Sequence, residues 1–153
     1  RAIRDGSVAE ARARLFAPMS DLAAGLALSQ LKRYPDMLNR RRSIADRYRA
    51  ALNHIPSVSL NQGAFARSMF FRFPVRTGSG LQGCQQAFLD RGIHIRRGVD
   101  ELLHRLMNCA DNEYPVSTEL FYTTVSLPIY PALSASEESS CVENAAAIFS
   151  HLH

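Results

Sequence analysis

The sequence is poor in lysine. Lysine and arginine together number 18, and Lys32 is the only lysine among them. Arginine forms no stable Schiff base and is not a nucleophilic amine, so lysine chemistry would have to come from Lys32 or from outside this chain. A catalytic lysine needs a desolvating pocket or neighbouring cations, whereas Lys32 lies beside Arg33 on the solvated side of a predicted helix. We therefore expect no catalytic and no cofactor-binding residue within these 153 residues.

Cysteine is also scarce. The three cysteines, Cys84, Cys109 and Cys141, have no paired spacing and form neither a CxxC nor a zinc motif. This pattern favours reduced thiols in a cytoplasmic protein. His151 and His153 near the end have no recognisable ligand partner, so no metal site is expected.

Long apolar runs are missing too. No stretch approaches the roughly 18 residues that a membrane helix needs, so no membrane partner is expected. The N-terminal segment is charged and lacks the apolar centre of a signal peptide, and the chain begins at Arg1 rather than Met, which fits an internal fragment or a processed chain. The sequence contains no GxSxG, HExxH, phosphate-loop or paired-carboxylate motif.

What is present is a globular composition and a long helix. Hydrophobic residues make up 46% of the chain and charged residues 21%, which suits one domain with a real core. The helix begins at Met19 and continues past Pro35, where the missing amide hydrogen requires a kink or a restart. Its first half carries a narrow apolar stripe with many small residues: Leu22, Ala23, Ala24, Leu26, Ala27 and Leu31.

The second part of the chain mixes strand and helix patterns. Met69–Val75 alternates as a strand, with Phe71 and Phe73 on one face. Ser134 and Glu137 have capping-box spacing and open a last helix that runs to about Leu152. The elements expected between them are a helix at Leu81–Arg91, a strand at Ile93–Arg96, a short helix at Glu101–Met107, a helix at Pro115–Thr124 and an extended edge segment at Ser126–Pro131.

This order predicts an α/β fold of the α+β sandwich kind. A long kinked N-terminal helix precedes a small, mostly antiparallel sheet that is covered by helices. The expected division is an N-terminal arm at 1–18, a linking helix at 19–56 and a small α/β domain at 57–153. Within the helix at Pro115–Thr124, Val116 and Leu120 are expected to be buried.

Several segments, taken together, resemble a known family. MSDLAAGLALSQL followed by RRRSIADRYRAAL, then FFRFPV, DRGI, LLHRL and SLPIYPALS, occur in the order and spacing of DegT/DnrJ/StrS-type sugar aminotransferases. The resemblance implies the small C-terminal domain of a pyridoxal-phosphate-dependent enzyme with the aspartate-aminotransferase fold. Such enzymes transfer an amino group to a nucleotide-linked keto-sugar. The resemblance also implies that the cofactor lysine lies in a larger N-terminal domain, of which 1–18 would be a remnant, and that the long helix packs at a homodimer interface.

The resemblance weakens where the family contacts its ligands. The family's phosphate-binding Asn and the two residues after it correspond to Phe16, Ala17 and Pro18, and a Gln of the opening helix corresponds to Ala23. A His-Tyr pair beyond the second strand is replaced by Gly98-Val99. The scaffold positions therefore match better than the binding positions.

Three residues are the candidate substrate contacts. His104 in LLHRL matches the family's substrate-side histidine, and its alternative is a partly buried histidine that caps a short helix. Arg96 and Arg97 follow the second strand, and a guanidinium fork suits a phosphate or a carboxylate. For His54 and His94, structural roles are expected.

Two other functions stay open at this point. In the first, the chain is a non-catalytic interaction domain, and its opening helix forms a homodimer or docks a partner. In the second, the chain binds a polyanion. Arginines between Arg40 and Arg49 would suit a polyanion, but Asp36 and Asp46 can pair with them at helical spacing and the net charge is only +4. No base-reading motif is present, so no nucleic-acid partner is expected.

Overall fold

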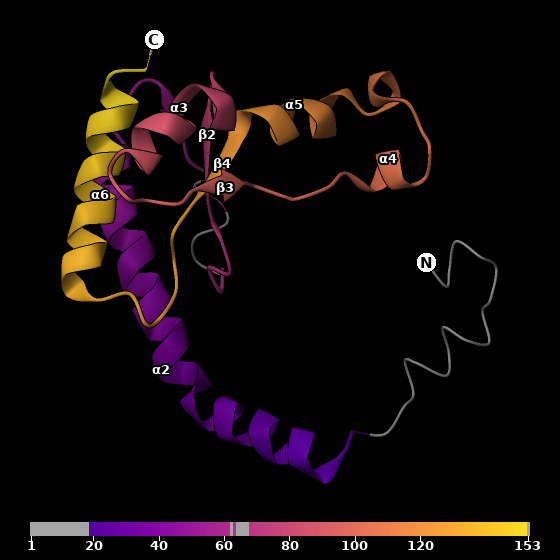
Figure 1. Ribbon diagram of the computed structural model, residues 1–153, viewed down its shortest axis with the longest axis vertical. Helices are drawn as coiled ribbons and strands as arrows, with labels where there is room; N and C mark the ends of the chain where they lie inside the picture. Colours follow the sequence, from indigo (N-terminus) through magenta and orange to yellow (C-terminus); the bar gives the residue numbers. More distant parts are fainter. Residues whose placement is uncertain (1–18, 62, 64–67, 153) are drawn as a thin grey trace. The chain divides into compact units, whose positions relative to one another are not determined.

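The computed structural model describes residues 19–61, 63 and 68–152 (Figure 1). The chain divides into two compact units, Arg1–Asp36 and Met37–His153. The predicted arm at 1–18, including Phe16, Ala17 and Pro18, lies outside the described residues.

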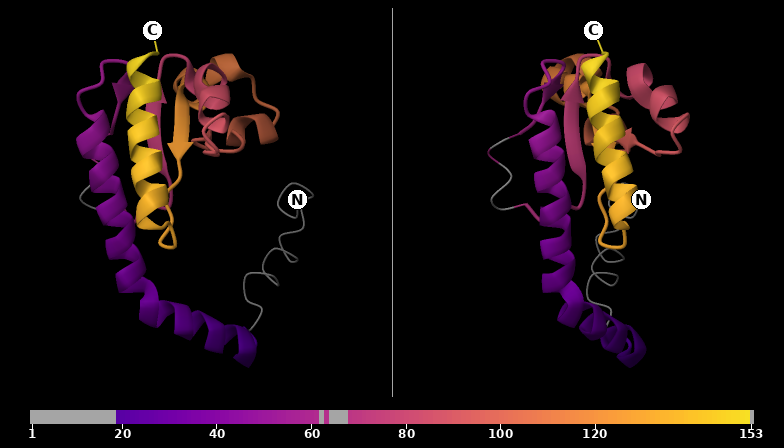
Figure 2. Two further views of the ribbon diagram at one scale, coloured as in Figure 1. Left: turned by 60° about the vertical axis from the view of Figure 1, so that its left-hand side comes forward. Right: turned by 90° about the vertical axis from the view of Figure 1, so that its left-hand side faces the viewer.

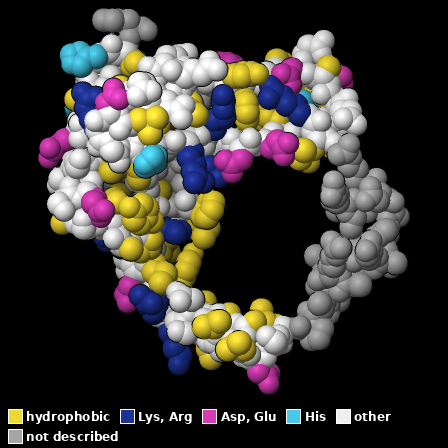
Figure 3. Space-filling view, viewed as in Figure 1, with side chains coloured by type: hydrophobic (Ala, Val, Ile, Leu, Met, Phe, Trp, Pro, Cys, Tyr) yellow, Lys and Arg dark blue, Asp and Glu magenta, His cyan; other side chains and the backbone are white. Residues whose placement is uncertain are grey.

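Helix α2, Asp21–Leu52, begins in the first unit and ends in the second. Ser20 caps its start, because the Ser20 hydroxyl accepts a hydrogen bond from the Ala23 amide at 3.3 Å. The helix continues through Pro35, beside the point where the two units divide. In the first unit, the leucines of the predicted apolar stripe are exposed, and Figure 3 shows hydrophobic side chains on the surface of this half of α2.

The second unit contains a four-stranded sheet in the order β1-β2-β4-β3, and every neighbouring pair is antiparallel. The predicted α/β fold with a small antiparallel sheet is therefore confirmed. Its elements are β1 (Val58–Ser59), β2 (Phe73–Thr77), α3 (Gly80–Leu89), β3 (Arg96–Arg97), α4 (Leu103–Leu106), the 3₁₀ helix η2 (Asp111–Glu113), α5 (Pro115–Thr123), β4 (Thr124–Leu127) and α6 (Ala135–Ser150).

The core lies on one face of this sheet. Alternate residues of β2 are buried, and the second half of α2, α3 and α6 cover them. The Tyr48 ring stacks on Phe73 with centroids 4.9 Å apart, and Phe88 meets Phe149 edge-on at 5.5 Å. Figure 2 shows α6 running alongside the second half of α2.

A buried ion pair joins these two helices. Glu138 of α6 is 2% exposed, and its carboxylate lies 2.6 Å from the Arg40 guanidinium and 3.0 Å from that of Arg47. Arg40 also donates to the Leu133 carbonyl oxygen at 2.8 Å. A buried carboxylate is tolerated when it is paired in this way.

The last helix agrees with its prediction. The Ser134 hydroxyl accepts from the Glu137 amide, and the Glu137 side chain accepts from the Ser134 amide, so the expected capping box is formed. Helix α3 also lies where it was predicted, within one or two residues at each end.

The first predicted strand was placed too early. Phe70 has a left-handed backbone with φ of +47° and is buried, while Phe71 is 68% exposed. The strand starts only at Phe73, so the prediction that Phe71 and Phe73 share a face is wrong. A positive φ breaks the alternation that an extended strand requires.

The region around β4 also differs from the prediction. The segment expected at a sheet edge, Ser126–Pro131, overlaps only the end of β4, and β4 lies between β2 and β3. Both prolines of the segment follow the strand, so they leave the ladder intact. The helix before it, α5, was expected to bury Val116 and Leu120, and both are exposed. The strand at Ile93–Arg96 is reduced to the Arg96–Arg97 pairing, and β1 was not predicted.

Candidate functional site

An open cavity of about 390 Å³ lies over β3 and β4 on the exposed face of the sheet. Antiparallel pairing places Arg96 opposite Ser126, and Ser126 opposite Pro74, in one cross-strand row. None of the described residues around this cavity is acidic. The lining consists of Phe71, Arg72, His94, Arg96, Ser126, Leu127, Pro128 and Tyr130.

Arg96 is the predicted site residue that lines this cavity. Ile93 and Ile95 are buried, whereas His94 and Arg96 are exposed, as expected for an extended segment whose side chains alternate. Among the residues that the structure describes, none forms a hydrogen bond or an ion pair with the Arg96 guanidinium, which is therefore available to a ligand.

Arg72 adds a second guanidinium that the sequence analysis did not select. Its Nη1 donates to the Arg97 carbonyl oxygen at 3.1 Å, and its Nη2 donates to the Asp100 carboxylate at 2.9 Å. Both bonds fix the side chain at the edge of the cavity. The sequence offers no signal for this role, because Arg72 and Arg96 are brought together only by the strand pairing.

Arg97 points to the other side of β3. Its guanidinium carbon lies 4.6 Å from the centroid of the Phe121 ring and 5.8 Å from that of Tyr122. Its Nη1 also donates to the Phe121 carbonyl oxygen at 3.3 Å. These contacts tie β3 to α5 by cation–π attraction and a hydrogen bond.

His104 is 6% exposed and held from two sides. Its Nε2 lies 2.9 Å from Asp111 Oδ1, and its ring stacks on Tyr114 with centroids 4.7 Å apart. Arg105 binds the same carboxylate through two nitrogens, at 2.8 and 2.6 Å. Hydrogen bonds from Arg105 first, and from His104 second, hold the pKa of Asp111 well below its usual range.

The structure therefore separates the three predicted residues. Arg105 lies over the same Phe121 and Tyr122 rings as Arg97, so Arg97 and the His104 segment meet on α5. Figure 3 shows basic and hydrophobic side chains intermixed over this region. Arg96 lies apart from them, in the cavity on the sheet.

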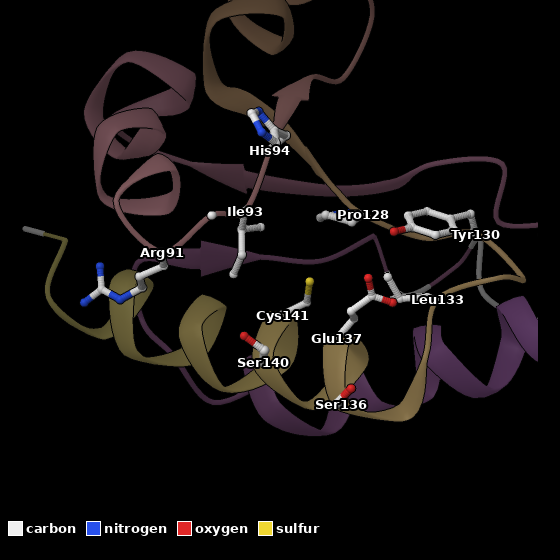
Figure 4. A pocket seen from close by; sticks show the side chains of 11 residues that line it. Arg91, Ile93, His94, Pro128, Tyr130, Leu133, Ser136, Glu137, Ser140 and Cys141 are labelled. Carbon is white, nitrogen blue, oxygen red and sulfur yellow. The ribbon is translucent and has the colours of Figure 1, made fainter.

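A second cavity, of about 440 Å³, adjoins the first. It extends along the first two turns of α6 and shares His94, Pro128 and Tyr130 with the first cavity. In Figure 4, the Ile93 side chain points toward Cys141 of α6, while Pro128 and Tyr130 lie to one side.

Other chemistry is limited in the part of the chain that the structure describes. Lys32 is exposed on α2, and no group of three His, Cys, Asp or Glu side chains there is arranged to hold a metal ion. All three thiols are free, and burial raises the pKa of the Cys84 thiol to about 11. No described helix is long and apolar enough to span a bilayer.

Curated relatives were found by sequence. The chain is 30% identical over 122 residues to dTDP-4-dehydro-2,3,6-trideoxy-D-glucose 4-aminotransferase from Saccharopolyspora spinosa, a match that covers 77% of this chain and 31% of that protein. It is 27% identical over 137 residues to the spore coat polysaccharide biosynthesis protein SpsC from Bacillus subtilis (strain 168), covering 82% and 35%. The chain thus spans about a third of the length of these relatives.

Solved structures share the fold. The aminotransferase TlmJ from Streptoalloteichus hindustanus matches 87% of this chain with a TM-score of 0.76 at 24% identity, and the match covers 37% of TlmJ. DesV from S. venezuelae, in complex with a ketimine intermediate, matches 88% with a TM-score of 0.79 at 18% identity, covering 38% of DesV.

The family assignment depends on the sequence profile rather than on these distant structures. The profile of the DegT/DnrJ/EryC1/StrS aminotransferase family matches residues 15–145, which is most of the chain. The match includes the long helix, the whole sheet and the first part of α6. The predicted resemblance is confirmed, and the chain belongs to the DegT/DnrJ/EryC1/StrS aminotransferase family.

Proposed function

We propose that the chain is the C-terminal part of a pyridoxal-phosphate-dependent aminotransferase that transfers an amino group to a nucleotide-linked keto-sugar. The family match over residues 15–145 is the observation that carries this proposal. One relative bears the name of a dTDP-keto-sugar 4-aminotransferase, which supports the substrate class.

The cofactor lysine is proposed to lie outside this chain. Pyridoxal phosphate needs a lysine in a pocket, and the single lysine, Lys32, is exposed on α2. The described residues therefore do not fit the cofactor, and we assign no chemical step to them. Their proposed contribution is to bind and orient the substrate.

Arg96 is the proposed substrate contact. Its unengaged guanidinium faces an open cavity without acidic lining, and a guanidinium fork suits phosphate oxygens. The contacts of Arg97 and His104 favour a structural role, since Arg97 is hydrogen-bonded to α5 and His104 is hydrogen-bonded to Asp111. We propose that they hold the loop between β3 and α5 in place around the site.

The remaining features of the proposal concern assembly and location. Residues 19–56 would link to a larger domain and form a homodimer contact, 57–153 would be the small domain, and 1–18 would belong to the larger one. A cytoplasmic location is proposed because the three thiols are free.

The alternative function is that of a non-catalytic dimerisation domain, which the exposed leucines of α2 favour.

Borohydride trapping tests the proposal. The chain, and a longer protein that includes the sequence encoded before Arg1, would each be incubated with equimolar pyridoxal phosphate, reduced and examined by peptide mass spectrometry. We expect one adduct in the longer protein, on a lysine outside this chain, and none on Lys32. The Lys32→Arg variant controls for adventitious labelling. An adduct on Lys32 in a defined site, or no adduct in the longer protein, would overturn the proposal.

A further inference from the structure

The Arg72 side chain connects two strands that do not pair with each other. β2 and β3 lie on opposite sides of β4, about 10 Å apart at the usual strand spacing. Arg72 precedes β2 and reaches over β4 to the end of β3, where it donates to the Arg97 carbonyl oxygen at 3.1 Å and to the Asp100 carboxylate at 2.9 Å. Its guanidinium carbon also lies 6.0 Å from the centroid of the Phe71 ring. Arg72 thus holds the chain after β3 against the start of β2.

The segment that Arg72 holds has little other support from the sheet. The pairing of β3 with β4 extends to Gly98, whose amide donates to the Thr124 carbonyl oxygen at 3.2 Å. The next three residues, 99–101, are exposed, and the Asp100 side chain is 73% exposed. Among the hydrogen bonds of the described residues, the one from Arg72 fixes the Asp100 carboxylate. The position of this carboxylate therefore depends on Arg72.

The position of Asp100 matters because of Arg96. Asp100 is four residues after Arg96, and the Arg72 guanidinium that binds it lines the same cavity as Arg96. The carboxylate is thus held at the edge of a cavity whose described lining has no acidic residue. A carboxylate released from Arg72 would be attracted to the unengaged Arg96 guanidinium and would occupy the donors that an anionic ligand needs.

From these contacts we infer that Arg72 is a positioning residue for Arg96: it holds Asp100 at the edge of the cavity and so keeps the Arg96 guanidinium free for a ligand. Arg96 is the proposed substrate contact, so the inference rests on the proposed function. Arg72 acts here through Asp100, and its own contact with a ligand is not required.

Labelling of the chain with phenylglyoxal tests the inference without any substrate. This dicarbonyl reacts with the neutral guanidine, and a neighbouring carboxylate favours the charged form, so a paired arginine reacts more slowly. Peptide mass spectrometry would follow the rate at Arg96, with fragment ions that distinguish it from Arg97. Arg72→Ala should slow the labelling of Arg96 about two- to fivefold, the effect expected of an exposed ion pair.

Removal of the competing carboxylate should reverse this effect. The double variant Arg72→Ala, Asp100→Asn should return the labelling of Arg96 to the wild-type rate, and Asp100→Asn alone should leave that rate unchanged. The control is Arg72→Ala, Glu119→Gln, which restores the same net charge by removing a carboxylate that pairs with Arg76. This control should label as slowly as Arg72→Ala, because Asp100 is still present.

A second variant keeps the test independent of protein stability. Arg72→Gln retains a donor for the Arg97 carbonyl oxygen but has no charge to hold Asp100, and it should slow the labelling of Arg96 as Arg72→Ala does. An unchanged or faster rate in both single variants, or an equal recovery in the two double variants, would overturn the inference. The borohydride experiment concerns a lysine and not these arginines, so a failure of the proposed function can be told apart from a failure of this inference.

Discussion

Asp111 joins the side chains around the loop between β3 and α5. Its carboxylate binds His104 and Arg105, and Arg105 in turn donates to the Tyr122 hydroxyl at 3.0 Å. The bonds from Arg105 and His104 are made to the ionised carboxylate, and together they lower the pKa of Asp111. The Asp111 side chain thus links η2 to α4, and Arg105 links α4 to α5, across a segment with few buried residues.

Asp111→Asn should make the protein less stable at neutral pH. A carboxyl group whose pKa is lowered on folding contributes stability that is fully present above its unfolded pKa of about 3.9 and is lost as the pH falls through the folded value. Urea unfolding at pH 7, 5 and 3 should therefore show a difference in the free energy of unfolding between wild type and variant. This difference should become smaller toward pH 3.

Asp46→Asn is the matched control. Asp46 forms an exposed ion pair with Arg49 at 3.0 Å, and exposed pairs contribute little. Its substitution should change stability slightly at each pH. The role given to Asp111 would be contradicted if the two substitutions lowered the free energy of unfolding equally. It would also be contradicted if the loss caused by Asp111→Asn stayed constant down to pH 3.

The sequence predicted individual residues of the site better than it predicted the residues that they contact. His104 could be selected from the LLHRL motif, and Arg96 from its place after a strand. Nothing in the sequence indicated that Asp111 would engage His104, or that Arg72 would share a cavity with Arg96. These partnerships depend on loop conformation and strand pairing, which one chain's residue pattern does not specify.

At the level of elements, the start of α3 packs closely against the end of α5. Gly80 has a φ of +58°, and a Cβ at this position would lie 1.8 Å from the Tyr122 carbonyl oxygen of α5. Glycine is required here for two reasons, since its backbone is left-handed and a second backbone approaches it closely.

Gly80→Ala should lower the free energy of unfolding by about 2–5 kcal/mol, since left-handed backbone costs about 1–2 kcal/mol and overpacking about 1–3 kcal/mol. Urea denaturation would measure the loss. Gly78→Ala, two residues earlier, places a Cβ with no atom within 4 Å and should change stability by less than about 0.5 kcal/mol. Similar stabilities for the two variants would show that the junction is not tightly packed.

Helices were easier to predict than strands. The capping box at Ser134 marked the start of α6, and apolar residues at helical spacing marked its buried face. By contrast, α5 passes into β4 at Thr123–Thr124 without a loop, so no turn residue marks the change. The two-residue strands β1 and β3 are too short to show an alternation.

At the level of the whole molecule, the family and fold class could be predicted because several motifs occur in order along one chain. The paired cavities could not, since their walls come from segments that are far apart in the sequence, such as 71–72, 91–96, 126–133 and 136–141. The apolar stripe of α2 was predicted, and its leucines are exposed in the first unit.

The proposed homodimer can be tested on this stripe. Sedimentation equilibrium of the 17.0 kDa chain should give about twice the chain mass, and the double variant Leu22→Glu, Leu26→Glu should sediment as a monomer, because charges on an apolar contact oppose its burial. Leu103→Glu, at an equally exposed leucine of α4, should leave the dimer intact. A wild-type chain that stays monomeric at high concentration would refute the proposal.

The ion pair between α2 and α6 has a consequence for any attempt to shorten this protein. A truncated version that starts after α2 would retain Glu138 but lose both Arg40 and Arg47. Removing the partner of a buried charge costs about 3–5 kcal/mol, a large share of a small domain's stability. The smallest autonomous version of the α/β unit must therefore begin before Arg40, and the link helix and the sheet domain form one folding unit from that residue onward.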